Sequence, residues 1–510
     1  AIAVGDTYEI DDFTYKVITT EVGNRGVEII AYNGSDTDIT IKDYIYVGNN
    51  IYLTVRSIAA GVFENNTTLS TVSGMRYIKN IGNRAFYGCT NLSKIELPNS
   101  LDAFGDEVFA YCANLEIFSI GNEIDSKGTT ALGTDHGILY FTNDEGRPVE
   151  ILACAPLGLT EGRGNITDKN AVKRINAGAF EGCQTLTEIA NYPLLEEIGD
   201  YAFKYCTNLQ DCKLTASTRL TKIGISCFEQ HMTTDAAENI LTLADNSSLT
   251  YIPSRAFYGR NFGETFPVFS AVKEISNEAF RRAYTPSTLD LTSMVNLTYI
   301  GEYAFADNYY TETLNLPASL TNIAGQAFYG TNALKRIAFP NGSNLLAIQV
   351  NAFRADLRNG VKKVFLQMEF PESLTTIYEG AFAGTNFYTH YEDGEYSICI
   401  PKNVSSIGAC AFSGHNVKIK NFFVDEENKY FTVEDGILFS KDMTRLLCCP
   451  SSNGMIEGEG VLAKGQEGYI IPPSVQKIDA DAFFYCKFPH IVLPSKLTYI
   501  DSGTFGSCTN

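Results

Sequence analysis

The stretch that decides the fold is IGNRAFYGCTNLSKIELP, which runs from Ile81 to Pro98. At its centre lies the pair Ala85-Phe86, with Ile81 five residues before the Phe and Ile78 eight residues before it. The same template surrounds 15 phenylalanines, namely Phe63, Phe86, Phe109, Phe180, Phe203, Phe228, Phe257, Phe280, Phe305, Phe328, Phe353, Phe382, Phe412, Phe483 and Phe505. Ile occupies the position five before the Phe in 14 copies, and Val, Ile or Leu occupies the position eight before it in all 15. Apolar residues that recur so regularly indicate a repeat architecture.

The commonest distance between these phenylalanines is 23 residues, and each unit of that length contains two apolar runs. In the run LSKIELP, strand alternation turns Ile95 and Leu97 inward and Lys94 and Glu96 outward. The run around the Ala-Phe pair spaces its apolar residues too widely for a long strand, and it predicts a short helical turn. Stacking the units in register places strand on strand and Phe on Phe, so the expected fold is an α/β repeat solenoid.

Two longer intervals interrupt the period, because 71 residues separate Phe109 from Phe180 and Phe412 from Phe483. The two intervals resemble each other. The matching segments are HGILYF (His136–Phe141) with DGILFS (Asp435–Ser440), and ILACAP (Ile151–Pro156) with LLCCP (Leu446–Pro450). Each pair reads as strand, polar turn and strand, which predicts β-hairpin coils near residues 134–156 and 430–450. Glycine-rich loops are expected after them, at Gly158–Gly164 and Gly454–Gly468.

Residues 1–54 do not follow the repeat and contain short β-rich runs separated by turn residues such as Gly23-Asn24. A solenoid needs a terminal unit to cover its first apolar layer. We therefore predict a β-rich N-terminal cap over residues 1–54 and a solenoid over residues 55–510. A glycine also recurs just after the apolar slot, at Gly82, Gly105, Gly199, Gly224, Gly301 and Gly408. A glycine repeated there indicates either a positive φ or a close approach of two backbones.

The charge balance excludes some classes of partner. The chain of 510 residues has 39 Lys and Arg against 59 Asp and Glu, a net charge of −20. This balance argues against nucleic acid, whose binding requires a basic patch, and against an anionic membrane surface. There is no run of about 18 apolar residues that would cross a membrane. The chain starts at Ala1 rather than Met, which we interpret as a processed or trimmed chain, and removal of an export signal is one way to produce it.

Thirteen cysteines would suggest disulfides in an exported protein. Six of them lie three residues after a repeat Phe: Cys89, Cys112, Cys183, Cys206, Cys486 and Cys508. A small apolar side chain at a fixed repeat position is a packing requirement, and free Cys behaves as a small hydrophobic residue. We therefore predict buried thiols at this position.

A search for catalytic patterns finds little. The five histidines form no HExxH pair, and neither a GxSxG elbow nor a phosphate-binding glycine loop occurs. The adjacent pair Cys448-Cys449 lies in a predicted strand, so one thiol is expected to face outward. Acidic pairs such as Glu196-Glu197 and Glu426-Glu427 lie at turns, where solvated carboxylates are expected. No catalytic residue, metal ligand or cofactor site is predicted.

At the repeat residues the sequence resembles a known family. IGNRAFYGCTNLSKIELPNSL (Ile81–Leu101) is similar to the BspA-like leucine-rich repeat proteins, also called the treponemal class, and so is DGILFSKDMTRLLCCP (Asp435–Pro450). The resemblance covers residues 55–510. It implies a right-handed superhelix with a parallel β-sheet on the concave face and short helices or 3-10 turns on the convex face. Members of the family are mostly exported surface proteins of host-associated bacteria, and some act as adhesins, without catalytic residues to transfer.

The outward strand positions are the candidate ligand-binding face. By alternation they are Lys94, Glu96, Glu188, Asp211, Lys213, Asn315, Arg336, Lys363, Phe365, Lys418 and Lys420. Several are basic despite the acidic total, so this face could contact an acidic protein or a glycan. Repeat arrays offer extended surfaces of this kind for binding.

The sequence therefore favours a non-enzymatic binding or adhesion protein at a bacterial surface, whose partner is an extracellular protein, a glycan or another bacterium. We expect it to be a monomer. Two alternatives stay open: a glycan-active or other enzyme whose site is built from loops at the long intervals, and a passive surface spacer. Exposed aromatic or basic residues clustered on one face would favour binding, whereas an evenly polar surface would favour the spacer.

Overall fold

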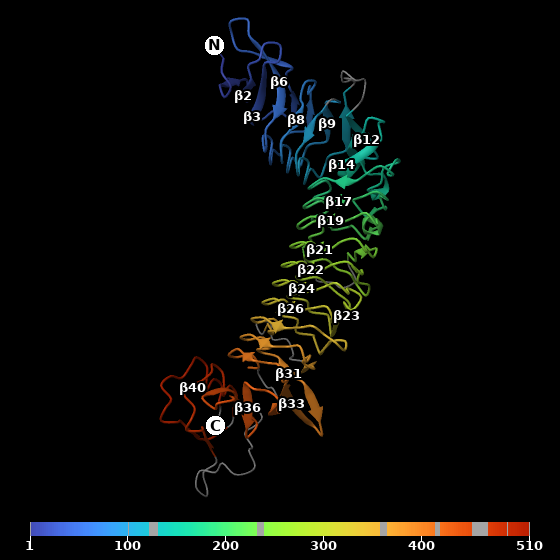
Figure 1. Ribbon diagram of the computed structural model, residues 1–510. Coiled ribbons are helices and arrows are strands. Elements are labelled where there is room, and N and C mark those ends of the chain that lie inside the picture. The colour runs from blue at the N-terminus through green and yellow to red at the C-terminus, as the bar shows by residue number, and fades with distance from the viewer. Residues whose placement is uncertain are drawn as a thin grey trace. The chain divides into compact units, whose positions relative to one another are not determined.

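Parallel strands stacked coil upon coil form the body of the protein, as the ribbon of the computed structural model shows (Figure 1). The structure describes residues 2–99, 101–121, 131–231, 239–356, 365–413, 419–450, 468–486 and 488–508. The chain divides into two compact units: unit 1 comprises Ala1–Leu249 and Arg255–Asn261, and unit 2 comprises Thr250–Ser254 and Phe262–Asn510. Within each unit the repeat solenoid expected from the sequence is confirmed.

One side of the coils is a column of short strands, the first strand column, that end on or beside the Ile of the template. In unit 1 these strands are β6 (Tyr52–Ile58), β8 (Asn80–Ile81), β10 (Ala103–Phe104), β15 (Arg174–Ile175), β17 (Glu197–Ile198) and β19 (Lys222–Ile223). In unit 2 they are β21 (Tyr251–Ile252), β22 (Glu274–Ile275), β24 (Tyr299–Ile300), β26 (Asn322–Ile323), β28 (Ala347–Ile348), β30 (Thr376–Ile377), β34 (Ser406–Ile407) and β40 (Lys477–Ile478). Neighbours pair in parallel with Ile beside Ile, as Ile300 beside Ile323, so one apolar side chain per coil enters the core.

A second strand column corresponds to the KIEL run. Its strands in unit 1 are β4 (Asp38–Thr40), β7 (Thr71–Ser73), β9 (Lys94–Leu97), β11 (Ile117–Ile120), β16 (Glu188–Ile189), β18 (Asp211–Cys212) and β20 (Thr242–Leu243). In unit 2 they are β23 (Thr288–Asp290), β25 (Thr313–Asn315), β27 (Arg336–Ala338), β29 (Phe365–Met368), β31 (Asn386–Tyr388), β33 (Glu395–Ile400), β35 (Ile419–Val424), β39 (Tyr469–Ile470) and β41 (Ile491–Val492). The predicted alternation is present in β9, where Lys94 and Glu96 are exposed while Ile95 and Leu97 are buried.

The third side, around the Ala-Phe pair and called the turn column below, is a run of tight turns in which Ala85 N–H bonds to Gly82 and Tyr87 N–H bonds to Arg84, rather than a continuous helix. Arg84 and Gly88 flank Phe86 with φ of 56° and 70°, so the backbone is left-handed on both sides of the Phe. Left-handed residues cannot continue a right-handed helix. They also let alternate N–H groups point to the next coil, as Phe86 N–H does to the carbonyl of Val108 at 3.0 Å. The 3-10 helices among the described residues are η1 (Pro156–Gly158), η2 (Thr160–Gly162) and η3 (Leu214–Ala216).

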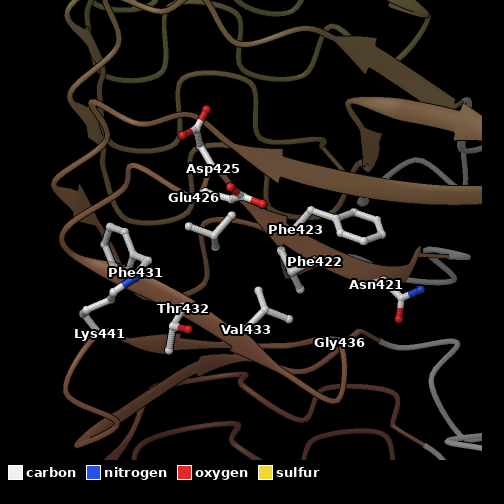
Figure 2. Close-up of a pocket in the computed structure, with 11 residues that line it drawn as sticks. Asn421, Phe422, Phe423, Asp425, Glu426, Phe431, Thr432, Val433, Gly436 and Lys441 are labelled. Carbon is white, nitrogen blue, oxygen red and sulfur yellow. The ribbon is translucent and has the colours of Figure 1, made fainter.

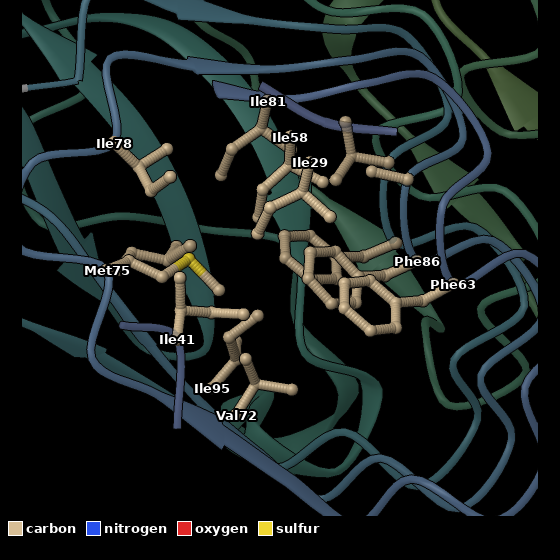
Figure 3. Packing of buried hydrophobic residues seen from close by; sticks show 14 of the residues in the cluster. Ile29, Ile41, Ile58, Phe63, Val72, Met75, Ile78, Ile81, Phe86 and Ile95 are labelled. Carbon is tan, nitrogen blue, oxygen red and sulfur yellow. The ribbon is translucent and has the colours of Figure 1, made fainter. Parts of the chain in front are cut away.

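The core of each unit is a stack of phenylalanine rings lined by the Ile, Val and Leu of the template, and Figure 3 shows part of this packing in the first coils of unit 1. The rings of Phe63 and Phe86 lie 4.9 Å apart and 8° from parallel, and those of Phe305 and Phe328 lie 5.3 Å apart and 2° from parallel. A single coil could not bury its apolar side chains. Stacked coils bury the inner faces of both strand columns. The apolar area removed from water is therefore the main stabilising contribution to the fold.

The cysteines that follow the repeat Phe are mostly buried, as predicted. Cys89 and Cys112 are buried, and each thiol lies 3.1 Å from the carbonyl of the repeat Phe one coil earlier. Cys183, Cys206 and Cys486 are buried in the same way, and all 13 cysteines are free thiols. Cys508 is exposed, contrary to the prediction. It belongs to the last coil that the structure describes. In the pair Cys448-Cys449, Cys448 is partly exposed and Cys449 is buried.

The recurring glycine marks a close approach of two backbones. A Cβ atom on Gly82 would lie 2.4 Å from the backbone nitrogen of Ala60 in the preceding coil, and one on Gly408 would lie 2.3 Å from that of Glu379. Neither glycine has a positive φ. Of the two interpretations that the sequence allows, close packing of coils is therefore the right one here.

The remaining strands belong to hairpins at the N-terminus and at the interruptions of the repeat. They are β1 (Thr7–Ile10), β2 (Phe13–Thr19), β3 (Gly26–Tyr32), β5 (Tyr44–Tyr46), β12 (Leu132–Asp135), β13 (Ile138–Thr142), β14 (Pro148–Cys154), β32 (His390–Glu392), β36 (Phe431–Glu434), β37 (Ile437–Ser440) and β38 (Arg445–Cys448). β1, β2 and β3 pair antiparallel, and β3 then pairs in parallel with β6. The antiparallel N-terminal strands thus join the first strand column directly.

Both long intervals contain an antiparallel three-stranded meander, β12–β13–β14 in unit 1 and β36–β37–β38 in unit 2. The last strand of each pairs in parallel with the next coil, β14 with β15 and β38 with β40. The expected glycine-rich loop Gly158–Gly164 overlaps η1 and η2. Most of the second expected loop, Gly454–Gly468, lies outside the described residues. Among the residues that the structure describes, no helix has the length and apolar character needed to span a bilayer.

Candidate binding surface

Four aromatic side chains of unit 2 form a cluster, called the aromatic belt below, where the second strand column meets the β32–β33 hairpin. They are Phe365 on β29, Tyr388 on β31, Tyr391 on β32 and Tyr396 on β33. Tyr396 is the hub, with its ring centroid 4.6 Å from Phe365, 4.8 Å from Tyr388 and 4.6 Å from Tyr391. Tyr391 is 57% exposed, and the other three are partly exposed. Burial against the neighbouring rings raises the pKa of Tyr388 above its ordinary value.

Local sequence explains how the rings meet. On β29 strand alternation buries Leu366 and Met368 and leaves Phe365 on the outer face. The hairpin places Tyr391 directly opposite Tyr396. Its turn is Asp393-Gly394, with φ of 51° and 87°. Two successive residues with positive φ are typical of the tight turn that matches the twist of antiparallel strands, and Asp-Gly is a preferred sequence for it.

Carboxylates surround the exposed end of the belt. Glu392, Asp393 and Glu395 are all exposed at the tip of the hairpin. The Nζ of Lys420 on β35 forms an ion pair with Glu395. The hairpin thus presents aromatic rings beside negative charge, a combination that attracts cations.

A separate pocket of about 460 Å³ lies between β35 and the β36–β37 hairpin (Figure 2). Asp425 and Glu426 line one end, Lys441 lines another part, and the ring of Phe423 is 53% exposed. This volume lies within the range of about 300–1,000 Å³ that small-molecule sites occupy. The expectation that Glu426 is solvated agrees with its exposure. The pocket is close in sequence to the belt and supplies a second surface on the same unit.

The candidate residues predicted from alternation fall on several sheets rather than on one. Lys94 and Glu96 belong to the sheet β4–β7–β9–β11, and Glu188 and Asp211 belong to β16–β18–β20, with Lys213 following β18. In unit 2 the structure places Asn315, Arg336 and Phe365 on the sheet β23–β25–β27–β29–β31, and Lys420 on β35. Lys363 and Lys418 lie outside the described residues.

Part of the positive charge expected on the outer face is neutralised. Lys213 Nζ lies 3.3 Å from Asp211, Arg163 Nε lies 2.7 Å from Glu188, and Lys420 pairs with Glu395. Strand alternation predicts which residues face outward. It does not predict which acidic side chain lies beside a given lysine. Among the predicted residues, Phe365 is the member of the aromatic belt.

The three tyrosines of the belt were missed by the sequence analysis. The segment FYTHYEDGEY, residues 387–396, contains all three of them and an Asp-Gly turn. That combination indicates an aromatic hairpin. The signal was obscured because this segment falls between two repeat units of unusual length.

Other exposed tyrosines lie in the N-terminal strands of unit 1. Tyr46 and Tyr52 are 53% and 62% exposed, with ring centroids 5.1 Å apart, and Tyr44 lies 5.4 Å from Tyr77. These are pairs rather than a hub with three neighbours. They are useful as a comparison for the belt.

Two further findings concern titratable groups in the described part of the chain. No group of three His, Cys, Asp or Glu side chains there could hold a metal ion. Glu181 is a buried carboxyl in unit 1, and burial, followed by the nearby carboxylate of Glu107, raises its pKa to about 8. It packs in the turn column, with Lys204 Nζ at 3.9 Å.

The coils and the pattern of their strands define the class of protein, a leucine-rich repeat solenoid. The family profile described as "BspA type Leucine rich repeat region (6 copies)" matches residues 45–142, 163–286, 234–358, 273–417 and 466–510. Because these matches cover well over half of the chain, it belongs to the BspA-type leucine-rich repeat family, as the resemblance implied.

Solved structures of bacterial proteins are also similar. A leucine rich cell surface protein from Faecalibacterium prausnitzii A2-165 is 20% identical, with a TM-score of 0.40, and the match covers 82% of this chain and 95% of that one. A leucine-rich repeat protein from Bacteroides ovatus ATCC 8483 is 16% identical, with a TM-score of 0.38, over 81% of this chain and 94% of that one. A search of curated protein sequences found no match.

Proposed function

We propose that this protein is a non-enzymatic binding protein that is exported and displayed at a bacterial cell surface. In this proposal it contacts an extracellular protein or glycan through the aromatic belt. The observation that carries the proposal is the cluster of partly exposed rings around Tyr396 on the outer face of unit 2.

Aromatic side chains are enriched at protein interfaces, where a few of them supply most of the binding free energy. A ring that is held by its neighbours loses little conformational freedom on binding, so Phe365, Tyr388 and Tyr396 are suited to this role. The BspA-type family, as the sequence resemblance implied, supports an exported surface protein. A passive spacer would not need a cluster of rings facing solvent.

Adhesion assays test the proposal. We expect the double variant Tyr391→Ala/Tyr396→Ala to lose most of its binding to immobilised extracellular matrix proteins or glycans, because the belt then lacks its hub and its most exposed ring. The matched control is Tyr46→Ala/Tyr52→Ala, which removes another facing pair of tyrosines from unit 1. Unfolding curves of both variants establish that each remains folded.

Equal adhesion by the belt variant and the wild type would reject the belt as the contact. Equal loss in the belt variant and the control would indicate a general effect of exposed tyrosines. Labelling of intact cells with an antibody against the protein tests its display separately, and labelling that requires permeabilised cells would contradict a surface location.

A further inference from the structure

The β32–β33 hairpin places an exposed tyrosine next to carboxylates that the described chain leaves unpaired. Tyr391 is 57% exposed and is followed by Glu392 and Asp393, both exposed. Within the described residues neither of these two carboxylates forms an ion pair, whereas Glu395 pairs with Lys420. The hairpin therefore has more negative charge than its own cation neutralises.

Elsewhere in the chain, an arginine contacts a tyrosine ring and a carboxylate at the same time. The guanidinium of Arg255 lies 3.9 Å from the ring centroid of Tyr258, and its Nη2 lies 2.7 Å from Glu229. Arg84 lies over Tyr87 at 3.6 Å in a second instance. A planar cation between a ring face and a carboxylate is thus a recurring local structure of the turn column. The hairpin has the ring and the carboxylates without the arginine.

A buried amide also lies next to the belt, on the strand that carries Tyr388. Asn386 is the register partner of Phe365, its side chain is only 5% exposed, and its Oδ1 accepts no hydrogen bond in the described structure. An acceptor without a donor is costly when it is buried. That oxygen is too deeply buried to meet a partner, so the exposed ring and carboxylates of the hairpin decide the ligand. Arginine carries five N–H donors and no acceptor, and it therefore suits a surface made of rings and carboxylates.

From these contacts we infer that the hairpin end of the aromatic belt binds an arginine-containing segment of a partner protein. The inference rests on the proposed function and narrows the partner to a protein with a basic segment. Arginine is favoured over lysine because its planar guanidinium stacks on a ring and pairs with a carboxylate in two hydrogen bonds at once. The net charge of −20 attracts such a segment over a longer range.

The experiment uses the full chain and fluorescein-labelled Gly/Ser peptides that carry arginines, lysines or glutamates at the same positions. Fluorescence anisotropy gives the affinity at low and at physiological salt. The test variant is Glu392→Gln/Asp393→Asn. The control is Asp144→Asn/Glu145→Gln, which removes two exposed carboxylates from the turn between β13 and β14 and changes the net charge equally.

We expect the arginine peptide to bind more tightly than the lysine peptide, and the glutamate peptide not to bind. The test variant should weaken the arginine peptide about tenfold, and the control variant should leave it nearly unchanged. Tyr391→Ala should reduce the preference for arginine over lysine, because the stacking surface is lost.

Equal weakening by the test and control variants would overturn the inference, because diffuse charge attraction would then explain the binding. Binding of neutral glycans at the belt without binding of the arginine peptide would also overturn it. If the arginine peptide fails to bind while the Tyr391→Ala/Tyr396→Ala variant still loses adhesion, the proposed function stands and only the choice of partner is wrong.

Discussion

The two hairpin insertions, one in each unit, have the same backbone design and different side chains. His136-Gly137 and Asp435-Gly436 form matching turns, with φ of 50° and 78° in the first and 51° and 74° in the second. At the end of the last strand of each meander, a cysteine N–H bonds to the carbonyl of the alanine in the next Ala-Phe pair, Cys154 at 3.0 Å in the first and Cys449 at 2.7 Å in the second. The two insertions therefore occupy equivalent positions of the repeat, one in each unit.

The difference concerns the carbonyl groups of the coil that precedes each insertion. In an uninterrupted pair of coils, Ile81 accepts the N–H of Gly105 at 2.8 Å. In unit 1 the Nδ2 of Asn176 reaches across to the carbonyl of Gly105 at 2.9 Å. In unit 2 the Nη2 of Arg445 reaches the carbonyl of Ile407 at 3.0 Å. An amide therefore bridges to the preceding coil in unit 1 and a charged group does so in unit 2, and the two acceptors lie one residue apart in the repeat, since Ile407 is the template Ile and Gly105 follows the template position of Phe104.

The guanidinium of Arg445, unlike the amide of Asn176, is charged and pairs with a carboxylate. Arg445 Nε donates to Asp479 at 2.8 Å, and its Nη2 donates to the other carboxylate oxygen. The side chain of Asp479 is 1% exposed. Asp479 occupies the position in its coil that Asn176 occupies in unit 1, one residue after the Ile of the first strand column. A neutral amide can therefore be lost at modest cost, but a buried carboxylate that loses its arginine cannot.

The largest expected effect is that of Arg445→Met. It should destabilise unit 2 by ~3–5 kcal/mol, because the buried Asp479 loses its hydrogen-bonded arginine and keeps only Lys477, whose Nζ is 3.9 Å away. Urea unfolding measures the change in the free energy of unfolding. Hydrogen exchange shows whether the loss is confined to the coils around β38 and β40. The control Arg147→Met removes the exposed pair that Arg147 forms with Asp168 in the other insertion, and it should leave the unfolding midpoint unchanged. Similar losses in both variants would refute the contrast between the two insertions.

The next effect depends on pH and belongs to unit 1. Glu181 directly follows the first repeat Phe after the insertion of unit 1. The equivalent residue after the insertion of unit 2 is Phe484. The pKa of Glu181 is raised to about 8 in the folded protein, so the folded state favours the protonated form. Stability from this group is present below about pH 4.5 and is lost as the pH rises to about 8. Glu181→Gln should therefore be more stable than the wild type above pH 8, by roughly 2–4 kcal/mol.

Unfolding of the wild type and of Glu181→Gln between about pH 5 and about pH 9 checks this sign. Glu145→Gln, an exposed carboxylate in the first insertion, should follow the wild type throughout. A wild-type stability that rises over the same range, relative to Glu181→Gln, would contradict the assignment of a raised pKa.

The smallest effect is expected for Asn176→Ala, which removes the amide that bonds to Gly105. The loss should be about 1–2 kcal/mol in unit 1, the cost of one buried hydrogen bond. It should be independent of pH, unlike the effect of Glu181→Gln. Hydrogen exchange at the amides of the neighbouring coils measures the change, and a loss as large as that of Arg445→Met would remove the distinction drawn between the two units.

The repeat positions predicted the fold well because they report burial. Ile81, Phe86 and Ile95 are buried as expected, and the similarity of the two long intervals corresponds to two matching meanders. A turn was expected around the Ala-Phe pair, but nothing in the residue types alone shows that Arg84 is left-handed. Such a conformation is imposed by hydrogen bonds to the next coil rather than by local preference.

The candidate surface was predicted only in part. Alternation correctly placed Lys94, Glu96 and Phe365 on outer faces. It could not show that Tyr388 and Tyr396 meet Phe365, since those residues come from other strands. Nor could it show that Lys420 is paired, because its partner Glu395 is 25 residues away. Contacts between coils depend on which residues the register brings together.

What the sequence by itself determined is the periodic burial of apolar residues, and hence a solenoid of the BspA-type leucine-rich repeat family. What only the tertiary structure decided is which outward side chains lie together, and which polar side chains bond to the coil that precedes each insertion. The physical reason is that burial follows from the pattern along one coil, whereas the aromatic belt and the Arg445–Asp479 pair are contacts between coils.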